Sequence, residues 1–332
     1  MKAASSVLVG IVALGGLLFL LGVDPSKLGD LAKYLPEVSG PTAGESSGDS
    51  GGGPPPRATT RVRVASFNIQ VFGQDKLGDA NVMEVLARVV RQFDVVAIQE
   101  IRSKSQDVMP RFLELINSTG AHYDYAISPR LGRTTSMEQY AFVYDTTTLE
   151  VDRDSMYVVG DPDDLLHREP FVGGFRVRGQ DAQRAFTFTL VNIHTDPDEV
   201  ALELNALDDV FRAVRNDGRG EDDVILLGDL NTDDQHLGDL GAMPNVACAI
   251  YGQTTNTRRT QQYDNLIFDK LATTEFTGRY GVVDLCREFN LSLENALKVS
   301  DHCPVWAEFD VIEGGSSGPQ QLTSTGTKDG WY

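Results

Sequence analysis

The chain has 332 residues, of which 41% are hydrophobic, so it can form one large domain or two ordinary ones with a sizeable core. Its 48 acidic residues against 29 basic ones give a net charge of -19, which argues against a protein that coats nucleic acid with a basic surface. The same balance suits a protein that binds divalent cations, because carboxylates are preferred ligands of these ions.

The first predicted element is an uncharged stretch of 21 residues, Ala3 to Val23. As a helix it would be about 32 Å long, enough to cross a bilayer core of about 30 Å. We therefore expect residues 1–23 to be a signal anchor with its amino terminus inside and an extracytoplasmic domain beyond it. A cleaved signal peptide, which would make the protein secreted, and a buried N-terminal helix are the alternatives; no A-x-A-like exit follows the stretch.

Two segments rich in glycine, serine and proline flank the remaining chain. Residues 24–59 contain SGPTAGESSGDSGGGPPP, which has almost no large apolar residues and predicts a juxtamembrane linker. Residues 313–332 have a similar composition and are expected to be a disordered tail. The folded domain is therefore expected to span residues 60–312.

Within residues 60–312, apolar runs predict strands and helices that alternate along the chain. One helix is expected from Asp79, as its N-cap, to Phe93, and a second spans residues 200–214. In the first strand the apolar phase changes after Val64, which a β-bulge or burial on both faces would explain. The pattern predicts a mixed α/β domain with strands at residues 61–72, 94–100, 139–145, 185–194, 223–231, 263–269 and 303–311.

Polar side chains collect at the ends of these strands. Each one alone has an ordinary explanation as a turn or surface residue, but the recurrence is hard to assign to chance. Asp229 and Asn231 are two apart, so we expect them on the same side of an extended chain. Oxygen ligands of this kind suit Mg²⁺, Mn²⁺ or Ca²⁺, and histidines titrate near neutrality. The set comprises Asn68, Glu100, His194, Asp229, Asn231, Asp264, Asp301 and His302.

Eight motifs then follow one another along the chain: ASFNIQVFG, VVAIQEIR, PRLGRTTSMEQYAFVYD, HREPFVGGF, LVNIHTDPDEV, ILLGDLN, YDNLIFD and SDHCPV. Over about residues 61–309 this series resembles the endonuclease/exonuclease/phosphatase superfamily. The third and fourth motifs are similar to pancreatic-type deoxyribonuclease in particular. The resemblance implies an α+β fold, a four-layer α/β/β/α sandwich of two packed sheets. It also implies an endonuclease that hydrolyses DNA with Mg²⁺ or Mn²⁺. No obligate protein partner is evident from the sequence, and we expect a monomer.

The resemblance further implies roles for individual residues. In this chemistry a divalent cation neutralises charge that grows on the phosphate, water loses a proton and the leaving sugar oxygen gains one. The implied catalytic residues are His194 and His302 as the acid–base pair, Glu138 and Asp264 as their orienting carboxylates, and Asp229 and Asn231, which hold the phosphate and the attacking water. The implied metal ligands are Glu100, Asn68 and Asp301. The residues that would bind the nucleic-acid backbone are Arg102, Arg133 and Arg168.

The sequence departs from the family pattern in three ways. Ser136 stands where animal enzymes place an aromatic residue that packs into the DNA minor groove, which puts that mode of groove reading in doubt. No cysteine follows Asn231 until Cys248, so the family's disulfide has no counterpart. The family's calcium sites do not transfer, although Ca²⁺ as a structural ion remains compatible.

Several alternatives stay open at the level of sequence. The three cysteines form no C-x-x-C pair, which argues against a zinc knuckle and leaves either one disulfide with a free thiol or three thiols. A phosphoesterase acting on lipid headgroups or small phosphates is a second function, suggested by the predicted anchor. A third is an inactive surface binding module, which would require a broken site.

Overall fold

A computed structural model describes residues 59–133 and 137–315. The predicted anchor, nearly all of the linker and tail, and Ser136 lie outside these residues. No helix within the two described ranges combines the length and apolar character needed to cross a bilayer.

Two six-stranded sheets form the centre of the molecule. Each has one parallel central pair, β1–β2 in the first sheet and β7–β8 in the second, and the strands on either side of each pair are antiparallel to it. In spatial order the first sheet contains β11 (Phe276–Val282), β12 (Val305–Asp310), β1 (Arg61–Phe72), β2 (Val95–Ile101), β4 (Gln139–Asp145) and β3 (Tyr123–Ile127). The second contains β5 (Leu149–Val158), β6 (Phe171–Val177), β7 (Thr187–His194), β8 (Val224–Asp229), β10 (Asp264–Asp269) and β9 (Val246–Cys248).

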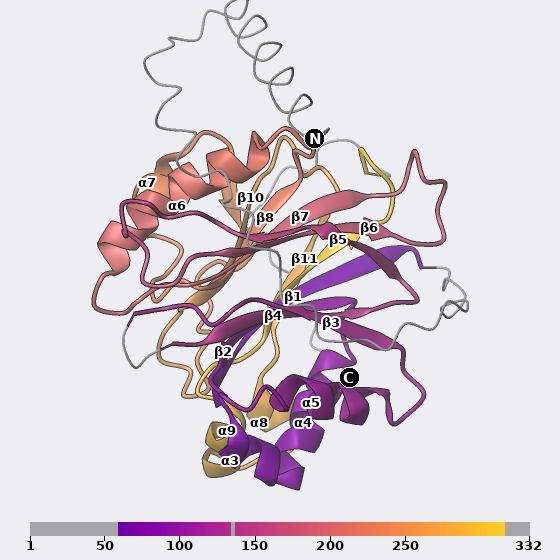
Figure 1. Cartoon of the computed structure of the whole chain (residues 1–332), viewed down its shortest axis with the longest axis vertical. Coiled ribbons are helices and arrows are strands. Elements are labelled where there is room, and N and C mark those ends of the chain that lie inside the picture. The colour runs from indigo at the N-terminus through magenta and orange to yellow at the C-terminus, as the bar shows by residue number, and fades with distance from the viewer. Residues whose placement is uncertain (1–58, 134–136, 316–332) are drawn as a thin grey trace, which may run out of the picture.

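The sheets pack face to face with helices on both outer faces, as Figure 1 shows. One apolar cluster fills the space between the sheets, and one lies under each helical layer. The predicted four-layer α/β/β/α sandwich is therefore confirmed. The first sheet is covered by α3 (Gln74–Gly78), α4 (Ala80–Val90), α5 (Val108–Asn117), α8 (Leu285–Glu288) and α9 (Leu293–Val299), and the second by α6 (Val200–Arg215) and α7 (Gly238–Ala242).

Burial on both faces explains the phase change after Val64 in β1, whereas the bulge of this strand lies further along it. Val64 faces the layer between the sheets, whereas Phe67 faces the helices, so the strand is buried on both sides. In addition, the register with β2 shifts between Asn68 and Phe72, which marks a bulge. This irregularity lies at the same end of β1 as the polar residues singled out above.

The layer between the sheets becomes polar toward that end. Gln99 Nε2 donates to Asn192 Oδ1 across the two sheets at 2.7 Å, and Ser66 Oγ lies 3.1 Å from the same nitrogen. Asn192 Nδ2 in turn donates to two backbone carbonyls of the first sheet, at 3.2 and 3.3 Å. All three side chains are fully buried, so these hydrogen bonds offset the cost of removing their polar groups from water.

Gly228 allows the close approach of β7 and β8. Its φ is +154, and an added Cβ would lie 1.9 Å from the carbonyl oxygen of Ile193. We predict that Gly228→Ala lowers the free energy of unfolding by about 3 kcal/mol or more, measured by urea denaturation. The matched control is Gly78→Ala, where an added Cβ meets no atom within 4 Å. If both variants were equally stable, the tight packing at Gly228 would be contradicted.

Candidate active site

Chain direction brings the polar residues to one rim of the sandwich. Both strands of a parallel pair end on the same side of their sheet, and an antiparallel neighbour begins there. The amide of Asn68 joins the two sheets at this rim, because its Nδ2 donates to Asp229 Oδ2 at 2.9 Å. Residues late in β1, β2, β7 and β8 therefore meet residues at the starts of β4 and β10, namely Asn68, Glu100, His194, Asp229, Glu138 and Asp264.

His194 ends β7 and is held between two carboxylates. Its Nδ1 lies 2.8 Å from Glu138 Oε1, and its Nε2 lies 3.5 Å from Asp229 Oδ2. Arg168 supports this pair, since its Nη1 donates to the His194 carbonyl at 3.0 Å and its Nε lies 3.2 Å from Glu138 Oε2. Burial opposes ionisation of Glu138, but His194, Arg168 and Arg102 lower its pKa to about 2. Burial likewise opposes the charged form of His194, yet Glu138 and Asp229 raise the pKa of this histidine.

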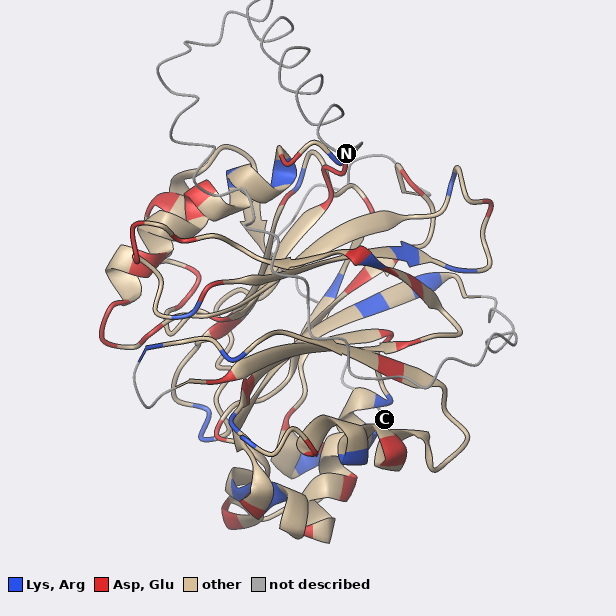
Figure 2. Ribbon diagram, in the orientation of Figure 1, with Lys and Arg blue, Asp and Glu red and all other residues tan. Residues whose placement is uncertain are grey.

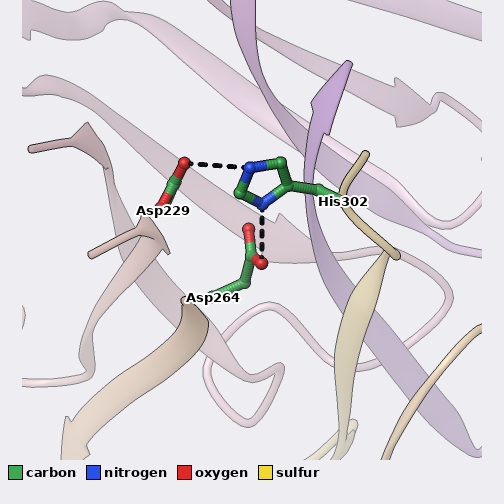
Figure 3. A group of neighbouring side chains, drawn as sticks. All are labelled: Asp229, Asp264 and His302. Atoms are coloured by element: carbon green, nitrogen blue, oxygen red, sulfur yellow. Dashed lines mark hydrogen bonds and ion pairs between the residues drawn. The ribbon is translucent and has the colours of Figure 1, made fainter. Parts of the chain in front are cut away.

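His302 has an equivalent arrangement on the other side of Asp229 (Figure 3). Its Nδ1 lies 2.9 Å from Asp264 Oδ2 and its Nε2 lies 3.5 Å from Asp229 Oδ2. Thr255 Oγ1 donates to the same Asp264 oxygen at 2.7 Å. Burial lowers the pKa of His302, but Asp264 and Asp229 outweigh it and raise the pKa to about 10. The three residues of Figure 3 are near enough to hold a metal, but both imidazole nitrogens face carboxylates, so we interpret them as an imidazolium between two anions.

Asn231 fixes the central carboxylate from its backbone. Its N–H donates to Asp229 Oδ1 at 2.9 Å, and its side-chain Nδ2 donates to Thr195 O at 2.9 Å. Its φ is +49, and β8 ends at Asp229, so the two residues do not share the extended chain that the sequence analysis expected. The turn instead directs a backbone donor at Asp229.

The predicted metal ligands offer oxygen atoms with unused bonding capacity. Asn68 Oδ1 and Asp301 Oδ1 are buried and have no hydrogen-bond partner among the described residues. Glu100 has a φ of +63, and its carboxylate accepts from Asn68 Nδ2 at 3.2 Å and from Val71 N at 2.8 Å. Carboxylate and amide oxygens form a hard donor set, so the residues present fit Mg²⁺ or Mn²⁺.

Lys76 of α3 was not predicted to belong to this site. Its Nζ donates to Val299 O at 2.5 Å and to Lys298 O at 3.2 Å, at the carboxyl end of α9 and just before Asp301. Burial lowers the pKa of Lys76 to about 8, although Asp301 and Glu100 act to raise it. A single lysine in a short helix gives no sequence pattern, so only the fold reveals this cation.

Ser300 is a second residue that the sequence analysis missed. Its Oγ donates to Asn68 O at 2.7 Å and accepts from His302 N at 3.0 Å. It therefore connects the predicted metal ligand on β1 to the histidine before β12. Its position next to Asp301 and His302 in the SDHCPV motif was the available signal.

The three arginines predicted to bind nucleic acid have different surroundings. Arg102 lies 3.1 Å from Glu100 and 3.2 Å from Glu138, with 28% of its side chain exposed. Arg168 is buried behind Glu138, where it supports the orientation of His194. Arg133 forms ion pairs with Asp164 and Glu199, each at 3.1 Å. Their contact with a nucleic-acid backbone stays a prediction.

All three cysteines are free thiols, so the disulfide alternative is excluded by the structure. Cys248 and Cys303 are buried, and Cys286 is half-buried. Burial raises the pKa of the Cys248 and Cys303 thiols to about 12 and about 11. Both are therefore inert structural groups at neutral pH.

Known proteins resemble this chain in sequence and in fold. Residues 65–302 match the model of the endonuclease/exonuclease/phosphatase family. Deoxyribonuclease gamma of Rattus norvegicus is 30% identical over 262 residues, covering 74% of this chain and 83% of the relative. Deoxyribonuclease-1-like 1 of Chlorocebus aethiops is 33% identical over 273 residues, covering 79% and 88%. The catalytic domain of human nocturnin with bound sulfate anion shares the fold, with a TM-score of 0.52, 14% identity and coverage of 76% and 94%.

The paired carboxylate at His302 generates a prediction about its titration. We predict that Asp264→Asn lowers the pKa of His302, because it removes the strongest carboxylate that stabilises the imidazolium. Histidine ring signals followed by NMR across pH measure the change, and the exposed His236, paired with Asp233, serves as an internal control.

Stability gives a second readout of the same group. A histidine with a raised pKa contributes its full stabilisation below pH 6.5, which is the ordinary histidine pKa. This contribution is lost as the pH rises toward about 10. The wild-type protein should therefore lose more stability across that range than Asp264→Asn. An unchanged His302 titration in the variant would contradict the charge arrangement.

Proposed function

Because this chain belongs to the endonuclease/exonuclease/phosphatase family, we propose that it is a divalent-metal-dependent endonuclease that hydrolyses DNA phosphodiester bonds. The observation that carries the proposal is the convergence of two carboxylate-paired histidines on one oxygen of Asp229. The deoxyribonuclease relatives support DNA as the substrate, since the similarity extends over most of both chains. The two histidines and the carboxylates that they contact lie together at one rim of the sandwich.

The proposed reaction needs charge on the phosphate to be neutralised and protons to be transferred, and different residues of the chain serve each need. A phosphodiester is anionic and resists nucleophilic attack, and a cation held by Glu100, Asn68 and Asp301 would supply neutralisation of the charge that grows on its oxygens. Arg102, which is partly exposed at the same rim, would add a positive charge on the side where the substrate approaches.

Proton transfer falls to the two histidines. Each directs Nδ1 at its orienting carboxylate, Glu138 or Asp264, which leaves Nε2 as the nitrogen that exchanges a proton with the reacting groups. Both Nε2 atoms face Asp229, so a phosphate bound there is within reach of both rings. One imidazole would accept the proton of the attacking water and the other would donate to the leaving oxygen, while Asp229 holds the water in line.

We also propose that the catalytic domain is extracytoplasmic and held at a membrane by residues 1–23, or secreted if that segment is cleaved. The uncharged stretch from Ala3 to Val23 supports this localisation. Mg²⁺ or Mn²⁺ is the proposed ion on the basis of the oxygen donors. The protein is proposed to act as a monomer.

Incubation of the purified protein with supercoiled plasmid DNA and Mg²⁺ tests the function. We expect nicking that a chelator abolishes, and we expect His302→Ala to lower the rate by about 10²–10⁴-fold through loss of acid–base catalysis. The control is His236→Ala, at an exposed histidine in the turn after β8. Near-normal turnover by His302→Ala would contradict the assigned role.

A substrate panel separates the proposed function from the alternatives. Sphingomyelin, phosphoinositides and DNA are compared at equal enzyme concentration. Hydrolysis of a lipid with intact DNA would assign the phosphoesterase function instead, and no hydrolysis of any substrate across metals and pH would favour a binding module.

The metal site is tested through the dependence of the rate on Mg²⁺. We expect Glu100→Gln to raise the half-saturating Mg²⁺ concentration by at least about tenfold, because a carboxylate ligand becomes a neutral amide. Glu84→Gln on α4 removes the same charge from an exposed side chain and should leave the curve unchanged. A Glu100→Gln variant with an unaltered Mg²⁺ curve would show that this carboxylate does not bind the ion.

A further inference from the structure

Three carboxylates meet at the end of the sandwich opposite the active site. Asp223 directly precedes β8, Glu275 precedes β11, and Glu313 follows β12. One oxygen of each lies within 4.8 Å of an oxygen of the others. The six residue steps from Asp223 to Asp229 along β8 separate this group from the active site by about 20 Å.

Hydrogen bonds fix one oxygen of Glu275 and one of Glu313. Gly314 N donates to Glu275 Oε1 at 2.6 Å, and Thr187 donates to Glu313 Oε1 from its backbone and hydroxyl at 2.7 and 3.1 Å. By contrast, Asp223 Oδ1 and Glu275 Oε2 are completely buried, and apart from the adjoining Thr273 hydroxyl and each other's carboxyl group they have no hydrogen-bond partner among the described residues. These residues are only 3% and 2% exposed, so two carboxyl groups are enclosed together away from water.

The surroundings of the group are acidic. The charges that act most strongly on the Asp223 carboxyl come from Glu275, Glu313 and Glu221, and Asp222 acts on Glu313 as well. The Thr273 hydroxyl adjoins Asp223 and is buried with it. Carboxylates enclosed together require a proton or a cation between them, because their mutual repulsion otherwise destabilises the fold.

We propose that Asp223, Glu275 and Glu313, with the hydroxyl of Thr273, bind a calcium ion that fastens the two sheets together. Calcium takes six to eight oxygen ligands at about 2.3–2.6 Å in flexible geometry, and one oxygen from each of the three carboxylates lies within 4.8 Å of the others, so all three can reach a common ion. Mg²⁺ demands near-ideal octahedral geometry and usually retains several waters, which fits a largely buried group of carboxylates less well. The exposed position of Glu313 leaves room for water to complete the coordination shell.

The site links segments that are distant in the chain. Asp223 leads into the second sheet, whereas Glu275 and Glu313 flank two strands of the first sheet. Burial and the neighbouring carboxylates raise the pKa of Asp223 to about 9, and burial raises the pKa of Glu275 and Glu313 too. Carboxylate ligands must lose their protons to bind a cation, so calcium binding is expected to strengthen as the pH rises.

Thermal unfolding of the full-length protein tests the proposal independently of nuclease activity. The parent carries Glu100→Gln, which weakens cation binding at the active site. At pH 8, 5 mM CaCl₂ is expected to raise its Tm by about 5 °C relative to EGTA, and by less at pH 6. The added pair Asp223→Asn and Glu275→Gln is expected to abolish the rise while equilibrium dialysis shows the loss of one bound Ca²⁺ per chain.

Two results would overturn the proposal. One is the same calcium-induced rise in Tm with and without the added pair. The other is no rise in the parent together with a higher Tm of the added pair in EGTA, which would mean that the carboxylates share a proton instead. If the added pair does not fold, Glu313→Gln at the exposed edge replaces it. That variant is expected to raise the half-saturating calcium concentration at least tenfold, and an unchanged value would overturn the proposal.

Discussion

The carboxylate of Asp229 is the group around which the active-site rim is organised. It is buried, and its Oδ2 lies 2.9 Å from the amide of Asn68 and 3.5 Å from Nε2 of both His194 and His302. A buried anion is tolerated only when donors and cations surround it, so the three neighbours must come close together for the fold to be stable. Since they come from both sheets and from the loop before β12, the same requirement assembles the catalytic groups.

The pairing of buried carboxylates with cationic neighbours distinguishes the rim from the rest of this acidic protein. Acidic residues are spread over both helical layers, with lysine and arginine residues interspersed among them (Figure 2). At the rim, each buried carboxylate has a cationic neighbour, as Glu138 has Arg168 and His194, and Asp264 has His302. A negative net charge is therefore compatible with an anionic substrate, because the local balance of charge governs its approach.

Much of the architecture could be predicted from local sequence patterns. The strands that were not predicted were missed for physical reasons. The strands β1 and β4 have their predicted bounds, and Asp79 caps α4 as expected, because apolar periodicity and capping are local signals. The strand β5 was missed because most of its residues are polar or partly exposed, and β11 because two glycines interrupt its short apolar pattern.

Membership of the site was likewise easier to predict than its geometry. Strand ends and motifs identified the acidic and imidazole groups, yet the left-handed turn at Asn231 and the burial of Lys76 against α9 depend on contacts between segments far apart in sequence. Such contacts produce no periodic pattern in the sequence. The role of Asp229 as a common partner of two histidines also depends on contacts between distant segments, so it could not be predicted either.

The amide pair between Gln99 and Asn192 has a consequence for how the two sheets are aligned. Apolar side chains can slide past one another at little cost, because dispersion and the hydrophobic effect are not directional. A buried amide that loses its partner costs about 1–3 kcal/mol. Displacement of one sheet by a single pleat would leave both the Gln99 and the Asn192 amide without this partner, so the cost would be incurred at each of them. The pair therefore fixes the alignment of the two sheets a short way beneath the rim, because only one relative position of the sheets keeps both amides hydrogen-bonded.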